Sequence, residues 1–205
     1  MPATLRAPPG TRSHGLSVAS LPVTAIDALV RLCPPPAVAW EEVERSLGLP
    51  LPADYKRLVG TYGCGVFDET VWLLAPGAPR ADEDLLAQTA ERAGVLESLW
   101  EIGEERPGEL EEPGARVVPW AYEEGSGAFL YWLVRPGRHP DEWTVLYNEG
   151  RGPLWEAHAT GCAAFLHAVL TGTAETAYFG FLYEVLAPAA HRFESAADVL
   201  GGCSP

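Results

Sequence analysis

Lysine is almost absent from this 205-residue chain: Lys56 is the only one, and every other basic side chain is arginine or histidine. A P-loop protein or a protein kinase needs a lysine beside a glycine-rich loop or on a particular strand, and Lys56 has neither context. Positive charge is scarce overall, because 14 Lys and Arg stand against 28 Asp and Glu, and the formal net charge is -14. Phosphate backbones and anionic membranes both attract clustered basic side chains. We therefore expect neither nucleic acid nor a membrane among the partners.

Paired cysteines and long apolar runs are missing too. Cys33, Cys64, Cys162 and Cys203 are far apart in the sequence, so there is no C-x-x-C metal or redox motif. A chain of this length, 47% of it apolar, does not need disulfides to hold a core, which indicates reduced thiols. Residues 1–20 lack the apolar segment of a signal peptide and are expected to form a mobile tail. These features predict a cytoplasmic protein without a metal site or cofactor.

Helical periodicity dominates both ends of the chain. Helices are expected at 24–30, 38–47, 52–62, within 82–105, at 160–170 and at 178–186. The region 82–116 is a helical insert that ends in a glutamate-rich loop, and residues 173–205 form a C-terminal extension with an expected helix.

The middle of the chain has the pattern of strands. The expected strands, rich in aromatic and β-branched residues, are 71–74, 117–122, 129–134, 143–147 and 153–155. Gly125-Ser126-Gly127 is expected to form a hairpin turn, and Pro119 indicates that 117–122 is an edge strand or enters the sheet late. The run 129–134 is apolar on both faces, which indicates a central strand. The fold class is therefore α+β: a single domain with an antiparallel or mixed meander of about four to six strands, flanked by N-terminal and C-terminal helices.

Several segments, in this order, resemble a known family. The first is Leu49-Pro50-Leu51-Pro52-Ala53-Asp54-Tyr55-Lys56, followed by Tyr62-Gly63-Cys64-Gly65-Val66-Phe67. Residues 120–127, 130–133, 141–147 and 160–170 follow. Together they resemble the SUKH superfamily, or Smi/Knr-type domain, across residues 24–172. Two features depart from that pattern: the insert at 82–116 is longer than expected, and Glu123-Glu124 replaces an Asp-rich hairpin entry.

The resemblance implies a non-enzymatic binding protein, since bacterial members are widely identified as immunity proteins against polymorphic toxins, often nucleases. Nuclease toxins tend to be basic because they bind phosphate, and an acidic inhibitor is steered towards such a partner. We therefore expect stoichiometric neutralisation of a bacterial nuclease-type toxin. The alternative is an intracellular scaffold or regulatory domain that binds an endogenous protein or a small ligand. The oligomeric state is left open.

Catalytic motifs do not favour an enzyme. Ser126 lies in Gly-Ser-Gly rather than in a G-x-S-x-G elbow, and Cys64 has no evident histidine partner. Glu123 and Glu124 are adjacent, so on a strand they face opposite sides and cannot act as a dyad. The sequence contains no H-E-x-x-H, dinucleotide-binding or acidic metal motif.

Candidate partner-binding residues come from three parts of the chain. They are Trp120, Trp143, Glu123, Glu124, Glu104, Glu105, Gly63 and Gly65. The aromatic residues would anchor a partner, the glutamates would attract a basic one, and the glycines would allow close backbone approach. Each group has an alternative explanation: strand aromatics pack in cores, glutamate-rich segments form solvated loops, and glycines end helices.

Overall fold

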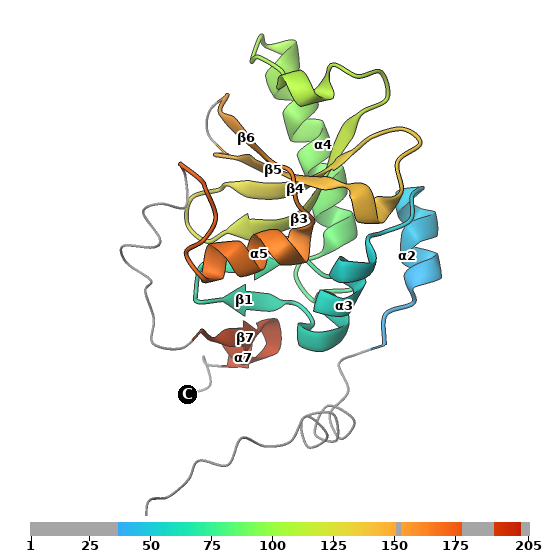
Figure 1. Cartoon of the computed structure of the whole chain (residues 1–205). Coiled ribbons are helices and arrows are strands. Elements are labelled where there is room, and N and C mark those ends of the chain that lie inside the picture. The colour runs from blue at the N-terminus through green and yellow to red at the C-terminus, as the bar shows by residue number, and fades with distance from the viewer. Residues whose placement is uncertain (1–36, 151–152, 178–190, 202–205) are drawn as a thin grey trace, which may run out of the picture. The chain divides into compact units, whose positions relative to one another are not determined.

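The chain folds around one antiparallel sheet with the strand order β6-β5-β4-β3-β2-β1-β7 (Figure 1). The computed structural model describes residues 37–150, 153–177 and 191–201. Its strands are β1 (Gly65–Phe67), β2 (Val71–Leu73), β3 (Arg116–Glu123), β4 (Phe129–Val134), β5 (Thr144–Asn148), β6 (Trp155–His158) and β7 (Phe193–Ser195). Its α-helices are α2 (Trp40–Leu47), α3 (Ala53–Tyr62), α4 (Leu85–Glu101), α5 (Cys162–Leu170) and α7 (Ala196–Gly201). Two 3-10 turns complete it, η1 (Gly108–Leu110) and η2 (Pro140–Glu142).

The α+β class predicted from the sequence is confirmed. Four of the five predicted strands have a counterpart, the fifth shares only Trp155 with β6, and the described residues form seven strands, more than expected. The two additional strands, β1 and β7, are three residues long, too short to display an alternating pattern. The helices expected at 24–30 and 178–186, and the tail expected at 1–20, lie outside the described residues.

Strand β3 is central, so the edge position that Pro119 suggested is wrong, but the alternative, late entry into the sheet, agrees with the register: β2 pairs with β3 only at residues 121–123, after the proline. The strand pairs with β2 on one side and with β4 on the other. A β-bulge shifts the register between Pro119 and Ala121. A bulge interrupts the ladder locally, so it accommodates a proline that cannot donate a backbone hydrogen bond. The central position predicted for β4 and the hairpin at residues 125–127 are confirmed.

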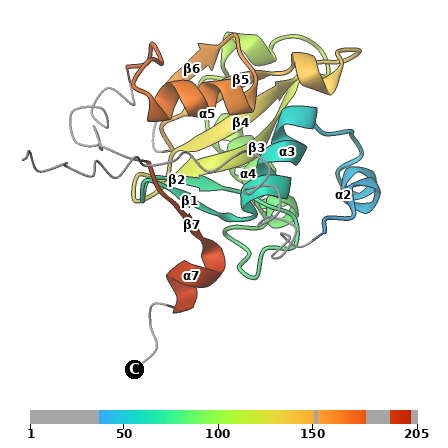
Figure 2. The same ribbon diagram turned by 60° about the horizontal axis from the view of Figure 1, so that its bottom comes forward.

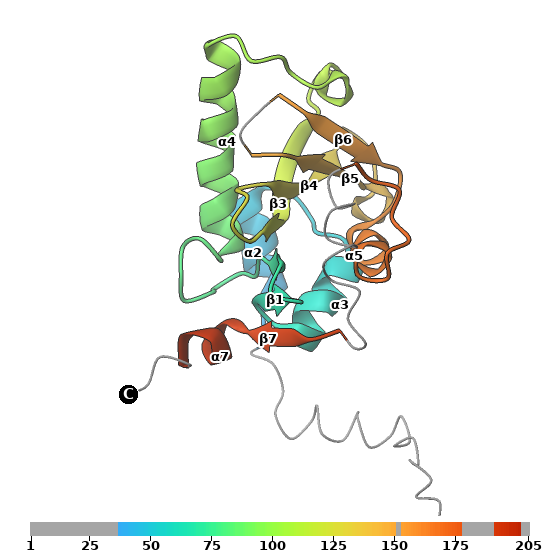
Figure 3. The same cartoon turned by 90° about the vertical axis from the view of Figure 1, so that its left-hand side faces the viewer.

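Helices cover the two faces of the sheet unequally. Helices α3 and α5 lie on one side of the sheet and α4 lies on the other (Figure 3). We call the side towards α3 and α5 the closed face; its core includes Tyr55, Trp120, Trp132, Tyr147 and Phe165. We call the side towards α4 the open face. There α4 and η1 pack on the β3–β5 part of the sheet through Leu96, Leu110, Tyr131, Leu133 and Leu146.

The Asp54-Tyr55 pair of the first motif joins α3 to the rest of the closed face. The Tyr55 hydroxyl is buried and donates a hydrogen bond to the Leu74 carbonyl oxygen at 2.6 Å. Asp54 accepts a hydrogen bond from the backbone N–H of Ala163 at 3.1 Å, in the first turn of α5. Because a carboxylate there satisfies an otherwise unpaired amide and complements the helix dipole, Asp54 ties α3 to α5.

The C-terminal extension contributes to the sheet, which therefore reaches beyond the boundary at 172 suggested by the family resemblance. Strand β7 pairs antiparallel with β1, and α7 follows it at that edge (Figure 2). A side chain at Gly65 would overlap the Glu194 carbonyl oxygen and the Phe193 ring. Asp68 accepts a hydrogen bond from the backbone N–H of Arg192 at 2.7 Å and pairs with His191 at 2.7 Å. The absence of a side chain at residue 65 thus permits the extension to lie against β1.

Candidate functional site

A pocket of about 770 Å³ opens on the open face, where the cover provided by α4 ends. Its walls come from the loop before α4, the first turns of α4, the end of β3, and the β7–α7 segment. Its apolar lining residues are Val66, Trp72, Tyr122, Phe129 and Val199. The pocket is within the size range of small-ligand sites and combines apolar walls with polar groups, as binding pockets do.

Aromatic rings from neighbouring strands form the floor of this pocket. Trp72 and Tyr122 are register partners on β2 and β3, with ring centroids 6.0 Å apart and an interplanar angle of 5°. Phe129 continues the row, 5.7 Å from the Tyr122 ring. The rings of Tyr122 and Phe129 are half-buried. Burial raises the pKa of Tyr122, and the nearby Glu124 carboxylate raises it further, so the hydroxyl stays protonated at neutral pH.

Carboxylates outnumber cations around these rings. Six acidic residues line the pocket: Glu69, Asp82, Glu83, Glu91, Glu124 and Glu194. The cations that line it are Arg80 and Arg92. An excess of negative charge above an aromatic surface favours a cationic occupant, because carboxylates and ring faces both attract positive charge.

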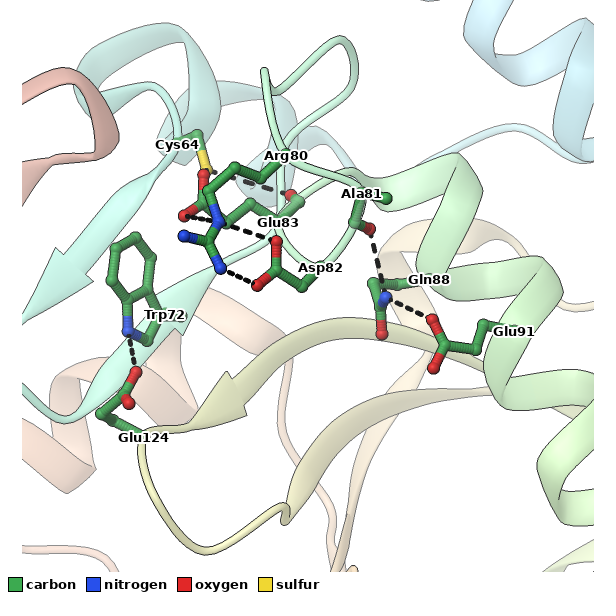
Figure 4. A network of polar contacts seen from close by, with 9 residues as sticks. All are labelled: Cys64, Trp72, Arg80, Ala81, Asp82, Glu83, Gln88, Glu91 and Glu124. Atoms are coloured by element: carbon green, nitrogen blue, oxygen red, sulfur yellow. Dashed lines mark hydrogen bonds and ion pairs between the residues drawn. The ribbon is translucent and has the colours of Figure 1, made fainter. Parts of the chain in front are cut away.

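Arg80 and Glu83 form an ion pair at the edge of the pocket (Figure 4). The Arg80 Nε atom lies 3.3 Å from Glu83 Oε1, and its guanidinium also contacts both oxygens of Asp82. Glu83 is only 3% exposed, and this burial raises the pKa of its carboxyl, although Arg80 lowers it in part. On the other side of Glu83, Cys64 Sγ lies 3.9 Å from Oε2.

Cys64 is poorly suited to nucleophilic chemistry. Burial and the Glu83 carboxylate raise the pKa of its thiol to about 12. The thiol is therefore protonated at neutral pH, and the reactive form of cysteine is the thiolate. The arrangement can hold a cation but lacks an activated sulfur.

The wall formed by α4 is held by its own side chains. Gln88 is buried and donates from Nε2 to the Ala81 carbonyl oxygen at 3.1 Å and to Glu91 Oε2 at 2.9 Å. The Arg92 guanidinium lies 4.5 Å above the Phe129 ring, and Nε donates to the Tyr131 hydroxyl at 3.1 Å. These contacts fix Arg92 against the sheet, which leaves Arg80 as the exposed cation among those lining the pocket.

Glu123 and Glu124 separate to opposite faces, as expected for adjacent strand residues. Glu124 accepts a hydrogen bond from Trp72 Nε1 at 2.5 Å and lines the pocket. Glu123 turns towards the closed face, where it accepts hydrogen bonds from the Tyr147 hydroxyl at 2.8 Å and Ser126 Oγ at 3.0 Å. Of these two candidate partner-binding glutamates, only Glu124 therefore lines the pocket.

Trp120 and Trp143, which the sequence suggested as anchors for a partner, do not lie on the surface. Trp120 is 0% exposed and Trp143 is 4% exposed, and both belong to the closed-face core. The Trp132 ring lies between them, with centroids 6.5 Å from Trp120 and 6.1 Å from Trp143. Helices α3 and α5 cover this face, so a partner cannot reach these rings without unfolding it.

The glycines and the acidic loop also lie apart from the pocket. Gly63 ends α3 with a φ of 75°, so its role is that of a helix terminator. Gly65 does allow close backbone approach, but to the chain's own β7 rather than to a partner. Glu104 is half-buried and Glu105 is exposed, both following α4, and neither lines the pocket. Pocket residues that the sequence did not single out include Trp72, Arg80, Glu83 and Glu194.

Comparison of the chain with protein-family models, with curated proteins and with solved structures finds no match.

In the part of the chain that the structure describes, none of the helices combines the length and the apolar character that crossing a bilayer requires. Across residues 37–150, 153–177 and 191–201, no three His, Cys, Asp or Glu side chains form a group suited to a metal ion.

Proposed function

We propose that this chain is a non-enzymatic, cytoplasmic binding protein of the SUKH type that neutralises a basic bacterial toxin, of the nuclease class, by forming a stoichiometric complex. The observation that supports this proposal best is the pocket on the open face. Six carboxylates and two arginines surround an aromatic floor there, so the surface complements a basic protein.

The charge of the pocket suits an inhibitor of a nuclease. A nuclease binds phosphate with clustered Lys and Arg side chains, and an acidic surface competes for those same side chains. The net charge of -14 adds long-range attraction that speeds association with a basic protein. Aromatic side chains such as Tyr122 supply contact area at low cost in conformational entropy, as anchors in interfaces do.

The toxin as the specific partner follows from the resemblance to the SUKH family. The motif around Asp54 and Tyr55 and the meander of β3, β4 and β5 are the segments that support it. A basic partner is supported independently by the pocket, so the charge of the partner can be tested without reference to the family.

The test is co-expression of the full chain with the toxin domains encoded next to its gene. We expect one of them to co-purify in a 1:1 complex and its toxicity to be suppressed. The double variant Glu124→Gln and Glu194→Gln should weaken the complex by about tenfold or more at low salt, and less at high salt. The matched control, Glu104→Gln with Glu105→Gln, removes the same charge outside the pocket and should weaken it by less than about threefold. Absence of any bound toxin domain would contradict the proposal.

A scaffold or regulatory protein that binds a small organic cation is the second candidate. The observation that favours it is the size of the pocket, about 770 Å³, which lies within the range of small-molecule sites. A rise in melting temperature with agmatine, lost in the Glu124→Gln and Glu194→Gln variant, would favour this candidate over a protein partner.

A further inference from the structure

We propose that Glu83 is the anchor for an arginine side chain of the partner, and that Arg80 occupies this position until the partner binds. The inference rests on the proposed function, because it names the group that the acidic pocket would take from a basic protein.

The first reason is the position of Glu83. Its side chain is 4% exposed, yet the charged group facing it at ion-pair distance is Arg80, with Nε 3.3 Å from Oε1. A buried carboxylate is costly unless a cation or hydrogen-bond donors face it. The Cys64 thiol beside Oε2 is only a weak donor, so a cation is the partner that stabilises this carboxylate most, and the fold supplies one from its own loop.

The second reason is that Arg80 is easily replaced. Its side chain is 51% exposed, and its other acidic contact, Asp82, is 52% exposed. Ion pairs between exposed side chains contribute little to stability, so Arg80 can move into solvent with little loss once a second cation faces Glu83. The Arg80 side chain takes no part in the hydrogen bonds of Gln88 to Ala81 and of Arg92 to Tyr131 that hold the helix wall, so turning it into solvent breaks neither of them.

The third reason is geometric and distinguishes arginine from lysine. The Arg80 guanidinium meets Asp82 through Nε at 2.9 Å and through a second nitrogen, while Nε also faces Glu83. The two-nitrogen contact is with Asp82, and Glu83 faces Nε alone, so it is the two carboxylates together that suit the planar fork of a guanidinium, whereas an ammonium group is a point charge. The ring of Trp72 and the carboxylate of Glu124 line the same pocket and offer further attraction to such a group.

The test is an NMR titration of the full chain with acetyl-arginine amide, with acetyl-citrulline amide as the neutral analogue of similar shape. We expect the arginine compound to shift the pocket resonances and the citrulline compound to bind at least about tenfold more weakly. Arg80→Gln should increase the affinity for acetyl-arginine amide by about tenfold, since the internal competitor is gone. Adding Glu83→Gln should reverse that gain.

Matched variants separate this effect from general electrostatics. Arg138→Gln removes an exposed arginine that pairs with Glu142 outside the pocket, and should change the affinity by less than about twofold. Arg80→Lys keeps the charge but loses the fork, so its affinity should lie between those of wild type and Arg80→Gln. Equal effects of Arg80→Gln and Arg138→Gln, equal binding of the two compounds, or no effect of Glu83→Gln would each overturn the inference.

The inference and the proposed function can fail separately. If a toxin domain binds and Glu83→Gln leaves its affinity unchanged, the arginine anchor is wrong and the proposed function stands. If acetyl-arginine amide follows the expected pattern while no basic protein binds, the anchor stands and the proposed function is wrong.

Discussion

The two faces of the sheet differ in what lies above their aromatic residues. On the closed face, α3 and α5 cover rings such as Trp120 and Trp132, which are 0% exposed. On the open face, α4 covers only part of the sheet, and the rings of Tyr122 and Phe129 remain half-buried beside charged side chains. Beneath α3 and α5 the sheet carries an apolar core. Where the cover provided by α4 ends, the open face instead carries aromatic rings together with carboxylates. The same residue type therefore serves stability on one face and is available for recognition on the other.

The largest expected difference between the faces is in stability. Trp120→Ala should lower the free energy of unfolding by about 3–5 kcal/mol, because it empties the middle of the closed-face core. Denaturant titration monitored by circular dichroism measures this. Ile102→Ala is the control, since Ile102 is 82% exposed and its truncation should change stability by less than about 0.5 kcal/mol. A loss below about 1 kcal/mol for Trp120→Ala would show that the closed face is not the main core.

Most of the fold could be predicted from the sequence because the longer helices and strands show the periodic pattern of apolar residues that identifies them. The hairpin of β3 and β4 and the helix α3 each have enough residues to display their period. Strands β1 and β7 have three residues each, and β7 joins the sheet far along the chain from β1. The pairing of β1 with β7 leaves no pattern in the neighbouring sequence, because it depends on packing and on the close approach that Gly65 permits.

The site was harder to predict because the bulge in β3 reverses the alternation of its side chains. Simple alternation places Trp120 and Tyr122 on one face, since they are two residues apart. The bulge between Pro119 and Ala121 instead leaves Trp120 on the closed face and sends Tyr122 to the open face. For the same reason Glu124 lies in the pocket, whereas Glu123 lies on the closed face. Aromatic and acidic residues, the types that the sequence singled out, do line the pocket, but which of them face it depends on the bulge in β3.

The next comparison is between the edge of the sheet, where β7 and α7 lie, and helix α5 on the closed face. Gly65→Ala should destabilise the protein by about 1–3 kcal/mol, because the new methyl group overlaps the Glu194 carbonyl oxygen. The loss should concentrate in β7 and α7, so hydrogen exchange should become faster at residues 193–199 and remain unchanged in α5. Gly60→Ala is the matched control: Gly60 lies within α3 with open space around it, so alanine should stabilise by about 0.5–1 kcal/mol. Equal exchange rates in wild type and Gly65→Ala would contradict a role for Gly65 in seating β7.

The smallest expected effect is a pH dependence at the pocket itself. Burial raises the pKa of Glu83 above its ordinary value of 4.5, and Arg80 opposes this only in part. An acid whose pKa is higher in the folded than in the unfolded state destabilises the fold once it is ionised. That penalty is absent below the unfolded pKa, grows as the pH rises towards the folded pKa, and is constant above it.

Glu83→Gln removes this penalty, so the variant should gain stability relative to wild type as the pH is raised from about 4 to 7. Denaturant titrations at several pH values measure the gap between the two proteins. Glu97→Gln on the exposed side of α4 removes one charge of the same sign and supplies the baseline for overall charge. A gap that narrows with rising pH would mean that Arg80 more than compensates the burial of Glu83. A widening gap would mean that the open face retains a carboxylate at a cost in stability that the closed face, with no buried acid among its described core residues, does not bear.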